Sequence, residues 1–175
     1  MLTSRPMPSI GRWWSKRRAL AVLPLFVAAC GGPRFDGRVF HEGDLFFRVG
    51  AVPASWRTVD VKGSLLAFRD DAATATIAVN GRCGLDGDDV PLEALTHHLF
   101  LHFTERKLIR QDRLTLDGRA ALRTELSASL DGVPLYYRVV VVKKDTCVYD
   151  FMLMSPSGEG TAEFDRFVSG FETLP

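Results

Sequence analysis

Two Asp-Gly pairs divide the second half of the chain into long segments in which apolar and polar residues alternate. Asp117-Gly118 and Asp131-Gly132 each stand between two such segments, and an Asp-Gly pair in this setting is a strong signal for a two-residue β-hairpin turn. The polar stretch 143–146 predicts one more turn. The chain is therefore expected to run back and forth as antiparallel strands over residues 108–116, 119–130, 135–142 and 147–154.

The first half of the chain predicts shorter strands. Apolar alternation occurs over residues 45–49, 57–61, 64–69 and 74–79, with polar turns between the segments. The Gly- and Asp-rich stretch 80–90 is expected to be a loop.

Two helices complete the pattern. The first is predicted from an apolar stripe at helical spacing, formed by Leu92, Leu95, Leu99 and Phe103. Pro91 suits its first turn, and Asp89 is available as a cap. The second helix closes the chain and is predicted from the same spacing in Phe164, Phe167, Val168 and Phe171. These elements predict an α+β domain, an antiparallel β-sheet with two main helices packed on it.

The order of the elements resembles the PsbP-like, or Mog-type, fold over residues 45–174. The resemblance is carried by Trp56 after its proline turn, by the long meander, and by the F-x-x-F-V-x-G-F ending that runs from Phe164 to Phe171. Known members of this family are largely non-enzymatic accessory or partner-binding proteins, so the resemblance implies such a role here. No functional motif of the family maps onto this chain residue by residue.

The start of the chain has the pattern of an export signal. Basic residues at 16–18 precede an apolar run of eleven residues, 19–29, which is too short to span a bilayer as a helix, since spanning takes roughly 20 residues. The run ends on Val27-Ala28-Ala29-Cys30, which resembles a bacterial lipobox. An ordinary signal with a coincidental cysteine is the alternative. Met1 and Met7 are both possible starts.

These features predict a signal peptide over residues 1–29, a lipidated tether over 30–41 and a single α+β domain over 42–175. Cys30 is the expected lipidation site, with palmitate among its acyl chains, and it would anchor the protein to a membrane without spanning it. Gly31 follows the cysteine where an aspartate causes inner-membrane retention in enterobacterial lipoproteins. By that resemblance we expect the outer membrane, with the domain facing the periplasm.

The charge of the chain is unevenly distributed. Residues 1–29 contain five basic and no acidic side chains, so a net charge of +1 for the whole chain leaves −4 on the rest. An acidic body argues against nucleic acid as a partner, because phosphate recognition needs a concentrated basic face.

Once Cys30 is assigned to lipid, Cys83 and Cys147 remain. Two cysteines in an oxidising compartment usually pair, so a disulfide between them is expected. Two buried free thiols are the alternative.

Metal sites have weak support. His98, His102 and Glu105 at i, i+4 and i+7 would lie on one face of the first helix, although such residues more often form a solvated face. The loop Asp86-Gly87-Asp88-Asp89 offers oxygen ligands but lacks the EF-hand spacing. No metal or other cofactor is therefore expected.

No nucleophile elbow, phosphate loop or dinucleotide motif occurs in the sequence, so no enzymatic activity is expected. A hydrolase with a dispersed site is the weakest hypothesis. Aromatic and methionine side chains that could line a binding surface, or fill the core, are Trp56, Tyr136, Tyr137, Met152 and Met154. The leading hypothesis is a membrane-anchored envelope lipoprotein that binds a partner protein. The alternative is a periplasmic carrier of a small molecule or metal in a cleft between the sheet and the first helix.

Overall fold

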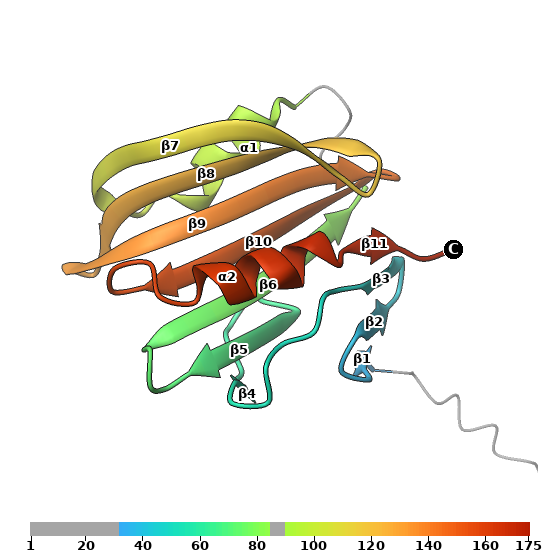
Figure 1. Ribbon diagram of the computed structural model, residues 1–175. Coiled ribbons are helices and arrows are strands. Elements are labelled where there is room, and N and C mark those ends of the chain that lie inside the picture. Colours follow the sequence, from blue (N-terminus) through green and yellow to red (C-terminus); the bar gives the residue numbers. More distant parts are fainter. Residues whose placement is uncertain (1–31, 85–89) are drawn as a thin grey trace, which may run out of the picture. The chain divides into compact units, whose positions relative to one another are not determined.

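Seven antiparallel strands form the larger of two β-sheets (Figure 1). The structure is a computed structural model that describes residues 32–84 and 90–175. The strand order is β4-β5-β6-β10-β9-β8-β7, so the four strands predicted for the second half of the chain lie side by side as one meander. The strands are β4 Arg57–Thr58, β5 Leu66–Asp70, β6 Ala75–Cys83, β7 Thr104–Leu116, β8 Arg119–Leu130, β9 Val133–Lys144 and β10 Cys147–Ser155.

A second, smaller sheet has the order β1-β2-β3-β11. Its strands are β1 Arg34–Phe35, β2 Val39–Glu42, β3 Leu45–Arg48 and β11 Glu172–Thr173. Residues 34–41, which we expected to belong to a tether, are thus part of the folded domain. The reason is apolar burial, because Phe40 is almost fully buried and its ring centroid lies 5.2 Å from that of Phe47. The folded domain therefore begins before residue 42.

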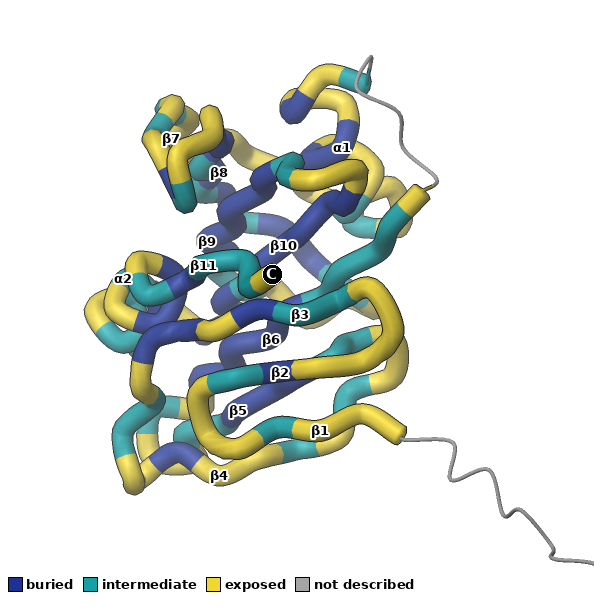
Figure 2. Tube along the Cα trace, turned by 90° about the vertical axis from the view of Figure 1, so that its right-hand side faces the viewer, coloured by how far each residue is buried: buried dark blue, intermediate teal, exposed yellow. Residues whose placement is uncertain are grey.

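The two helices cover opposite faces of the large sheet. Helix α1, Leu92–Leu99, packs with β8 and β9 on what we call the α1 face, and helix α2, Thr161–Ser169, packs on the other, the α2 face (Figure 1). Each face of the sheet carries an apolar cluster. Val139 and Val141 belong to the cluster under α1, Val140 and Val142 belong to the cluster under α2, and all four valines are buried. Figure 2 shows this burial along the central strands β6, β9 and β10. The α+β expectation is met, with one sheet more than predicted.

Helix α1 is shorter than its apolar stripe suggested. It ends at Leu99, and the chain turns through residues 100–103 into β7. Phe100 and Phe103 leave the helix because both rings pack edge-on against the buried ring of Tyr137, at centroid distances of 5.7 and 5.2 Å. In the part of the chain that the structure describes, no helix has the length and apolar character needed to cross a bilayer.

The C-terminal end of α2 crosses the chain that follows β3 at a contact between two glycines. The Gly50 N–H donates to the Phe167 carbonyl oxygen at 2.8 Å. A Cβ on Gly50 would lie 1.9 Å from the Arg166 carbonyl oxygen, and a Cβ on Gly170 would lie 2.4 Å from the Gly50 nitrogen. The glycine of the F-x-x-F-V-x-G-F ending therefore permits two backbones to touch.

Candidate protein-docking site

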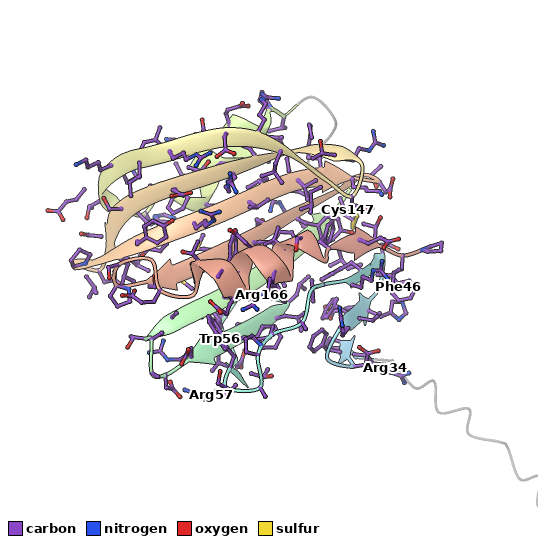
Figure 3. The ribbon with its side chains drawn as sticks, in the orientation of Figure 1. Arg34, Phe46, Trp56, Arg57, Cys147 and Arg166 are labelled. Atoms are coloured by element: carbon purple, nitrogen blue, oxygen red, sulfur yellow. A yellow bond between two sulfur atoms is a disulfide. The ribbon has the colours of Figure 1, made fainter. Side chains whose placement is uncertain are left out.

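The two cysteines expected to pair are joined by a disulfide. Cys83 ends β6 and Cys147 begins β10, and the two residues are direct partners in the antiparallel register; Figure 3 labels Cys147. The bond closes a sequence separation of 64 residues at the middle of the large sheet. The predicted signal peptide and the lipidation site Cys30 lie outside the described residues.

The three candidate metal ligands do not share a helix face. His98 lies in the last turn of α1, His102 follows the helix, and Glu105 belongs to β7, where its carboxylate accepts a hydrogen bond of 2.7 Å from the Ser129 hydroxyl. Because the helix ends at Leu99, the i, i+4, i+7 spacing no longer describes the positions of these side chains. Over residues 32–84 and 90–175, no group of three or more His, Cys, Asp or Glu side chains could hold a metal ion. The calcium candidates at 86–89 lie outside the described residues.

Most of the aromatic residues proposed for a binding surface fill the core instead. Tyr137 is fully buried in the cluster under α1. Trp56, labelled in Figure 3, is buried in the cluster under α2, and a Cβ added to Gly160 would lie 3.0 Å from its ring. Tyr136, Met152 and Met154 are half-buried. The two methionines border a hollow of about 190 Å³ on the sheet.

The most exposed part of the large sheet is its edge strand, β7. This strand has thirteen residues and pairs with β8 on one side only among the described residues. Leu108 and Ile109, at its middle, are 61% and 54% exposed. Leu101, just before the strand, and Val133, at the β8–β9 turn, are the other large apolar side chains that the described chain exposes. Three of these four side chains, Leu101, Leu108 and Ile109, lie on β7 or just before it, and such a concentration is typical of a contact surface.

A hollow borders the edge on each face of the sheet. On the α2 face, a groove of about 350 Å³ lies between α2 and the β7–β8 hairpin, with Leu114, Leu116 and Val168 in its apolar lining. On the α1 face, a hollow of about 210 Å³ lies between α1 and the same hairpin, over Phe100 and Leu126. The second hollow corresponds to the cleft that the carrier hypothesis requires. His97 lines it, and not His98 or His102.

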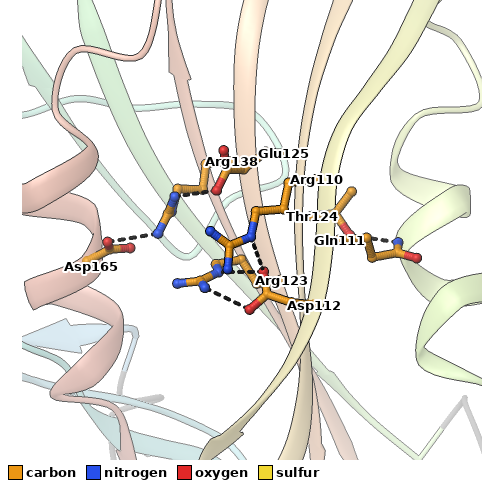
Figure 4. Close-up of polar contacts among 8 residues, drawn as sticks. All are labelled: Arg110, Gln111, Asp112, Arg123, Thr124, Glu125, Arg138 and Asp165. Carbon is orange, nitrogen blue, oxygen red and sulfur yellow. Dashed lines mark hydrogen bonds and ion pairs between the residues drawn. The ribbon is translucent and has the colours of Figure 1, made fainter.

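Ion pairs across the strands hold the hairpin against α2 (Figure 4). The buried Arg138 of β9 donates to Glu125 of β8 at 2.5 Å and to Asp165 of α2 at 2.8 Å. One strand further out, Arg123 donates to both carboxylate oxygens of Asp112 on β7, at 3.2 and 2.7 Å. These cross-strand pairs restrain β7 and β8 relative to the helix, so the edge strand is presented on a fixed support.

The electrostatics of this support follow from the same contacts. Hydrogen bonds from the Arg123 guanidinium hold the pKa of Asp112 below its usual value, and the Asp112 carboxylate raises the pKa of Arg123 in return. Burial raises the pKa of the Tyr136 phenol, which lies beside Arg138 and Glu125. Asp112 and Arg123 therefore stay ionised near neutral pH, and their ion pair keeps β7 and β8 tied together.

Asp117, in the β7–β8 turn, makes a second connection. Its carboxylate pairs with Lys144 at 2.6 Å and accepts hydrogen bonds from the Thr173 N–H and hydroxyl at 3.0 and 2.8 Å. Burial acts to raise the pKa of Asp117, but the bonds from Lys144 and Thr173 outweigh it, and the pKa lies below its usual 3.8. A carboxyl with a depressed pKa adds stability above the pKa of the unfolded chain, and this stability is lost as the pH falls through the folded value.

We therefore expect Asp117→Asn to lower the free energy of unfolding by about 1 kcal/mol at pH 7, with a difference that shrinks below pH 3.8. Asparagine tolerates the positive φ of this position, so the turn itself is kept. Urea unfolding at several pH values measures the effect. Asp131→Asn is the control, because Asp131 has the same turn conformation but no ion pair with a described residue. Equal pH profiles for the two variants would contradict the role of Asp117.

The sequence predicted β7 as a strand but did not single out Leu108 and Ile109. The signal was present, because two adjacent apolar residues between charged ones break the alternation of KLIRQDRL. In the structure Ile109 occupies a register shift in the pairing with β8, and this places neighbouring apolar side chains in solvent together.

No protein-family model and no curated protein sequence matches the chain. Among solved structures, a protein from Bacteroides thetaiotaomicron is similar, with a TM-score of 0.57 and 13% identity over 81% of this chain. This chain spans half the length of that protein. The mycobacterial protein LpqN, from Mycobacterium tuberculosis and involved in cell envelope biogenesis, matches over 77% of this chain and 88% of its own, with 15% identity and a TM-score of 0.49. A score at that level does not establish a common fold.

The cyanobacterial PsbP protein, CyanoP, from Synechocystis is similar over nearly its whole length. Its solution structure matches with a TM-score of 0.52 and 16% identity, over 85% of this chain and 99% of CyanoP. At this identity the likeness concerns the fold alone. It agrees with the resemblance carried by the order of elements and by the Phe-rich ending. The described chain therefore has a PsbP-like α+β fold.

Proposed function

We propose that this protein is a lipid-anchored accessory domain of the bacterial cell envelope that binds a partner protein and carries out no chemistry. The single observation that supports this most is the exposed edge of β7, with Leu108 and Ile109 at its middle on a rigid, ion-paired support. Exposed apolar residues on an ordered strand favour protein contact, since an isolated edge of this kind is a ready surface for association.

The placement of β7 suits this role. The described chain begins next to β1, and β7 lies at the opposite edge of the molecule in both Figure 1 and Figure 2. The edge of β7 is therefore remote from the point at which the described chain begins, which suits a domain that is tethered through the residues before Gly32. We further propose the outer membrane as the site of the anchor, with the domain in the periplasm, because Gly31 follows the cysteine.

Site-specific photocrosslinking in intact cells tests the proposal. A photoreactive residue replaces Ile109 in the full-length chain, and the control replaces Val133, which is equally exposed at 55% but lies off the edge strand. We expect one reproducible protein adduct from position 109, identified by its peptide masses, and none from 133. No adduct from 109, or equal adducts from both positions, would overturn β7 as the docking site. Mass measurement of the mature amino terminus tests the lipid on Cys30 separately.

A small-molecule carrier is the second candidate function, because the hollow between α1 and the β7–β8 hairpin has an apolar floor of Phe100 and Leu126. Its volume of about 210 Å³ is below the roughly 300–1,000 Å³ usual for ligand pockets, so it ranks second. Native mass spectrometry of protein extracted from membranes would reveal a bound small molecule if the carrier function is correct.

A further inference from the structure

The backbone pairing of β7 with β8 is irregular in the first half of the strand and regular in the second half. Register shifts interrupt the pairing with β8 between Thr104 and Lys107 and again between Leu108 and Arg110. From Arg110 to Leu116 the pairing is continuous. Bulges are the usual protection of an edge strand against backbone pairing, so the first half of β7 offers a partner the exposed side chains of Leu108 and Ile109, and the second half offers a regular backbone edge.

The turn that follows β7 fixes which backbone groups face outwards. Both residues of the turn 117–118 have positive φ, 48° and 71°, as in a two-residue type I′ hairpin. The flanking residues Leu116 and Arg119 then form a hydrogen-bonded pair, and bonded and non-bonded positions alternate from there along the strand. The N–H and C=O groups that point away from β8 are therefore those of Gln111, Arg113 and Thr115.

The outward side chains of this regular half are basic. Arg110 and Arg113 have side chains 60% and 64% exposed, and they pair with Asp112 at 3.2 Å and with Glu93 at 2.6 Å. The Asp112 side chain is 29% exposed and is shared with Arg123, which binds both of its carboxylate oxygens, so basic side chains remain in excess along this edge. A second copy of this chain is less complementary, because it would carry the same excess of basic side chains, and pairing centred on Arg113 would place two arginines directly opposite each other. An acidic strand is electrostatically complementary.

From these observations we infer that β7 receives an extended acidic segment of the partner protein as an eighth strand, paired along residues 110–116. This inference rests on the proposed function and names the chemistry of its partner. The outward backbone groups supply main-chain hydrogen bonds, as in other complexes formed by strand addition. Side chains of an added strand alternate between the two faces and lie next to the groove on the α2 face and the hollow on the α1 face, so apolar residues between the acidic ones fit this edge.

Two synthetic peptides test the inference with the full-length protein in detergent, one alternating valine with glutamate and the other valine with lysine. We expect the glutamate peptide to bind at least about tenfold more tightly than the lysine peptide. The double reversal Arg110→Glu/Arg113→Glu should weaken binding of the glutamate peptide by about tenfold. The matched control, Arg48→Glu/Arg57→Glu, changes the net charge equally and also breaks two ion pairs of exposed arginines, but away from β7, and it should leave the affinity unchanged.

Thr115→Pro separates strand pairing from simple charge attraction. It removes one outward N–H without removing a bond to β8, and proline is tolerated at such a position on an edge strand. We expect Thr115→Pro to weaken binding of the glutamate peptide about fivefold, while the urea midpoint of unfolding stays close to that of the native protein.

Three outcomes would overturn the inference. The first is equal binding of both peptides, and the second is unchanged binding of the glutamate peptide to Thr115→Pro. The third is that the protein binds only vesicles of anionic lipid and that the double reversal abolishes this binding, which would indicate a membrane contact. If Ile109 crosslinks to a protein in cells but the peptides do not bind, strand addition is wrong and the proposed function stands. If the peptides bind but no crosslink forms, the proposed function is wrong.

Discussion

Replacing Gly50 with alanine is expected to lower the free energy of unfolding by at least about 3 kcal/mol, enough to deplete the folded protein. The added Cβ would lie 1.9 Å from the carbonyl oxygen of Arg166 and 2.9 Å from the Cα of Phe167. Both are backbone atoms of α2, so no side-chain rotation can relieve the clash. The helix would have to move away from the large sheet, where Phe164 and Phe167 are fully buried.

Urea unfolding followed by circular dichroism measures this loss. Gly32→Ala is the matched control, because a Cβ at Gly32 meets nothing within 4 Å. Gly170→Ala should behave like Gly50→Ala, since its Cβ would lie 2.4 Å from the Gly50 nitrogen. If Gly50→Ala and Gly32→Ala had unfolding free energies within about 0.5 kcal/mol of each other, the close approach of the two backbones would be refuted.

Removal of the disulfide is the second large effect. The double variant Cys83→Ala/Cys147→Ala is expected to lose about 4 kcal/mol, because the bond constrains a sequence separation of 64 residues in the unfolded chain. The bond also joins the first half of the chain, through β6, to the meander that follows. Thermal and urea unfolding with and without reductant measure the loss.

A reductant should destabilise the native protein by the same amount and leave the double variant unchanged. An effect of reductant on the double variant would show that another site is responsible. Equal stability of the oxidised and reduced native protein would contradict a structural role for the bond.

Local sequence signals were sufficient for the meander. The Asp-Gly pairs predicted both tight turns, and Asp117, Gly118, Asp131 and Gly132 all have the positive φ that such turns require. The closing helix was equally predictable, since three of its four stripe residues lie inside α2 and Phe171 packs next to it in the same cluster. In each case the information is contained within a few neighbouring residues.

The sequence also contains a pattern that indicates burial of the large sheet on both faces. Four consecutive valines, 139–142, leave no polar face on β9, and such runs are typical of strands covered on both sides. By contrast, the pairing of β1 and β2 with β3 depends on Phe40 meeting Phe47 and on the return of the chain end as β11. The β2–β3 hairpin is local, but the pairing of β11 with β3 joins the two ends of the domain, and no local pattern indicates it.

The three weak metal-ligand candidates do not share a helix face for a related reason. Helical spacing over residues 92–103 was correct as a pattern, but Phe100 and Phe103 gain more by packing on Tyr137 than by continuing the helix. The last apolar residues of the stripe therefore belong to the core, and His98, His102 and Glu105 separate. Tertiary packing overrides local propensity when buried aromatic area is available.

The amino-acid sequence by itself determined the turns, most strands, the α+β class and the pair of cysteines, because each depends on residues that are close in the chain or on simple chemistry. Only the tertiary structure decided which faces the helices cover, that residues 34–41 join a sheet, and that β7 is left as an edge with a hollow on either side. Apart from the local pairing of β1, β2 and β3, those features arise from contacts between segments far apart in sequence. Their energies depend on which surfaces meet, and periodicity along the chain does not specify this.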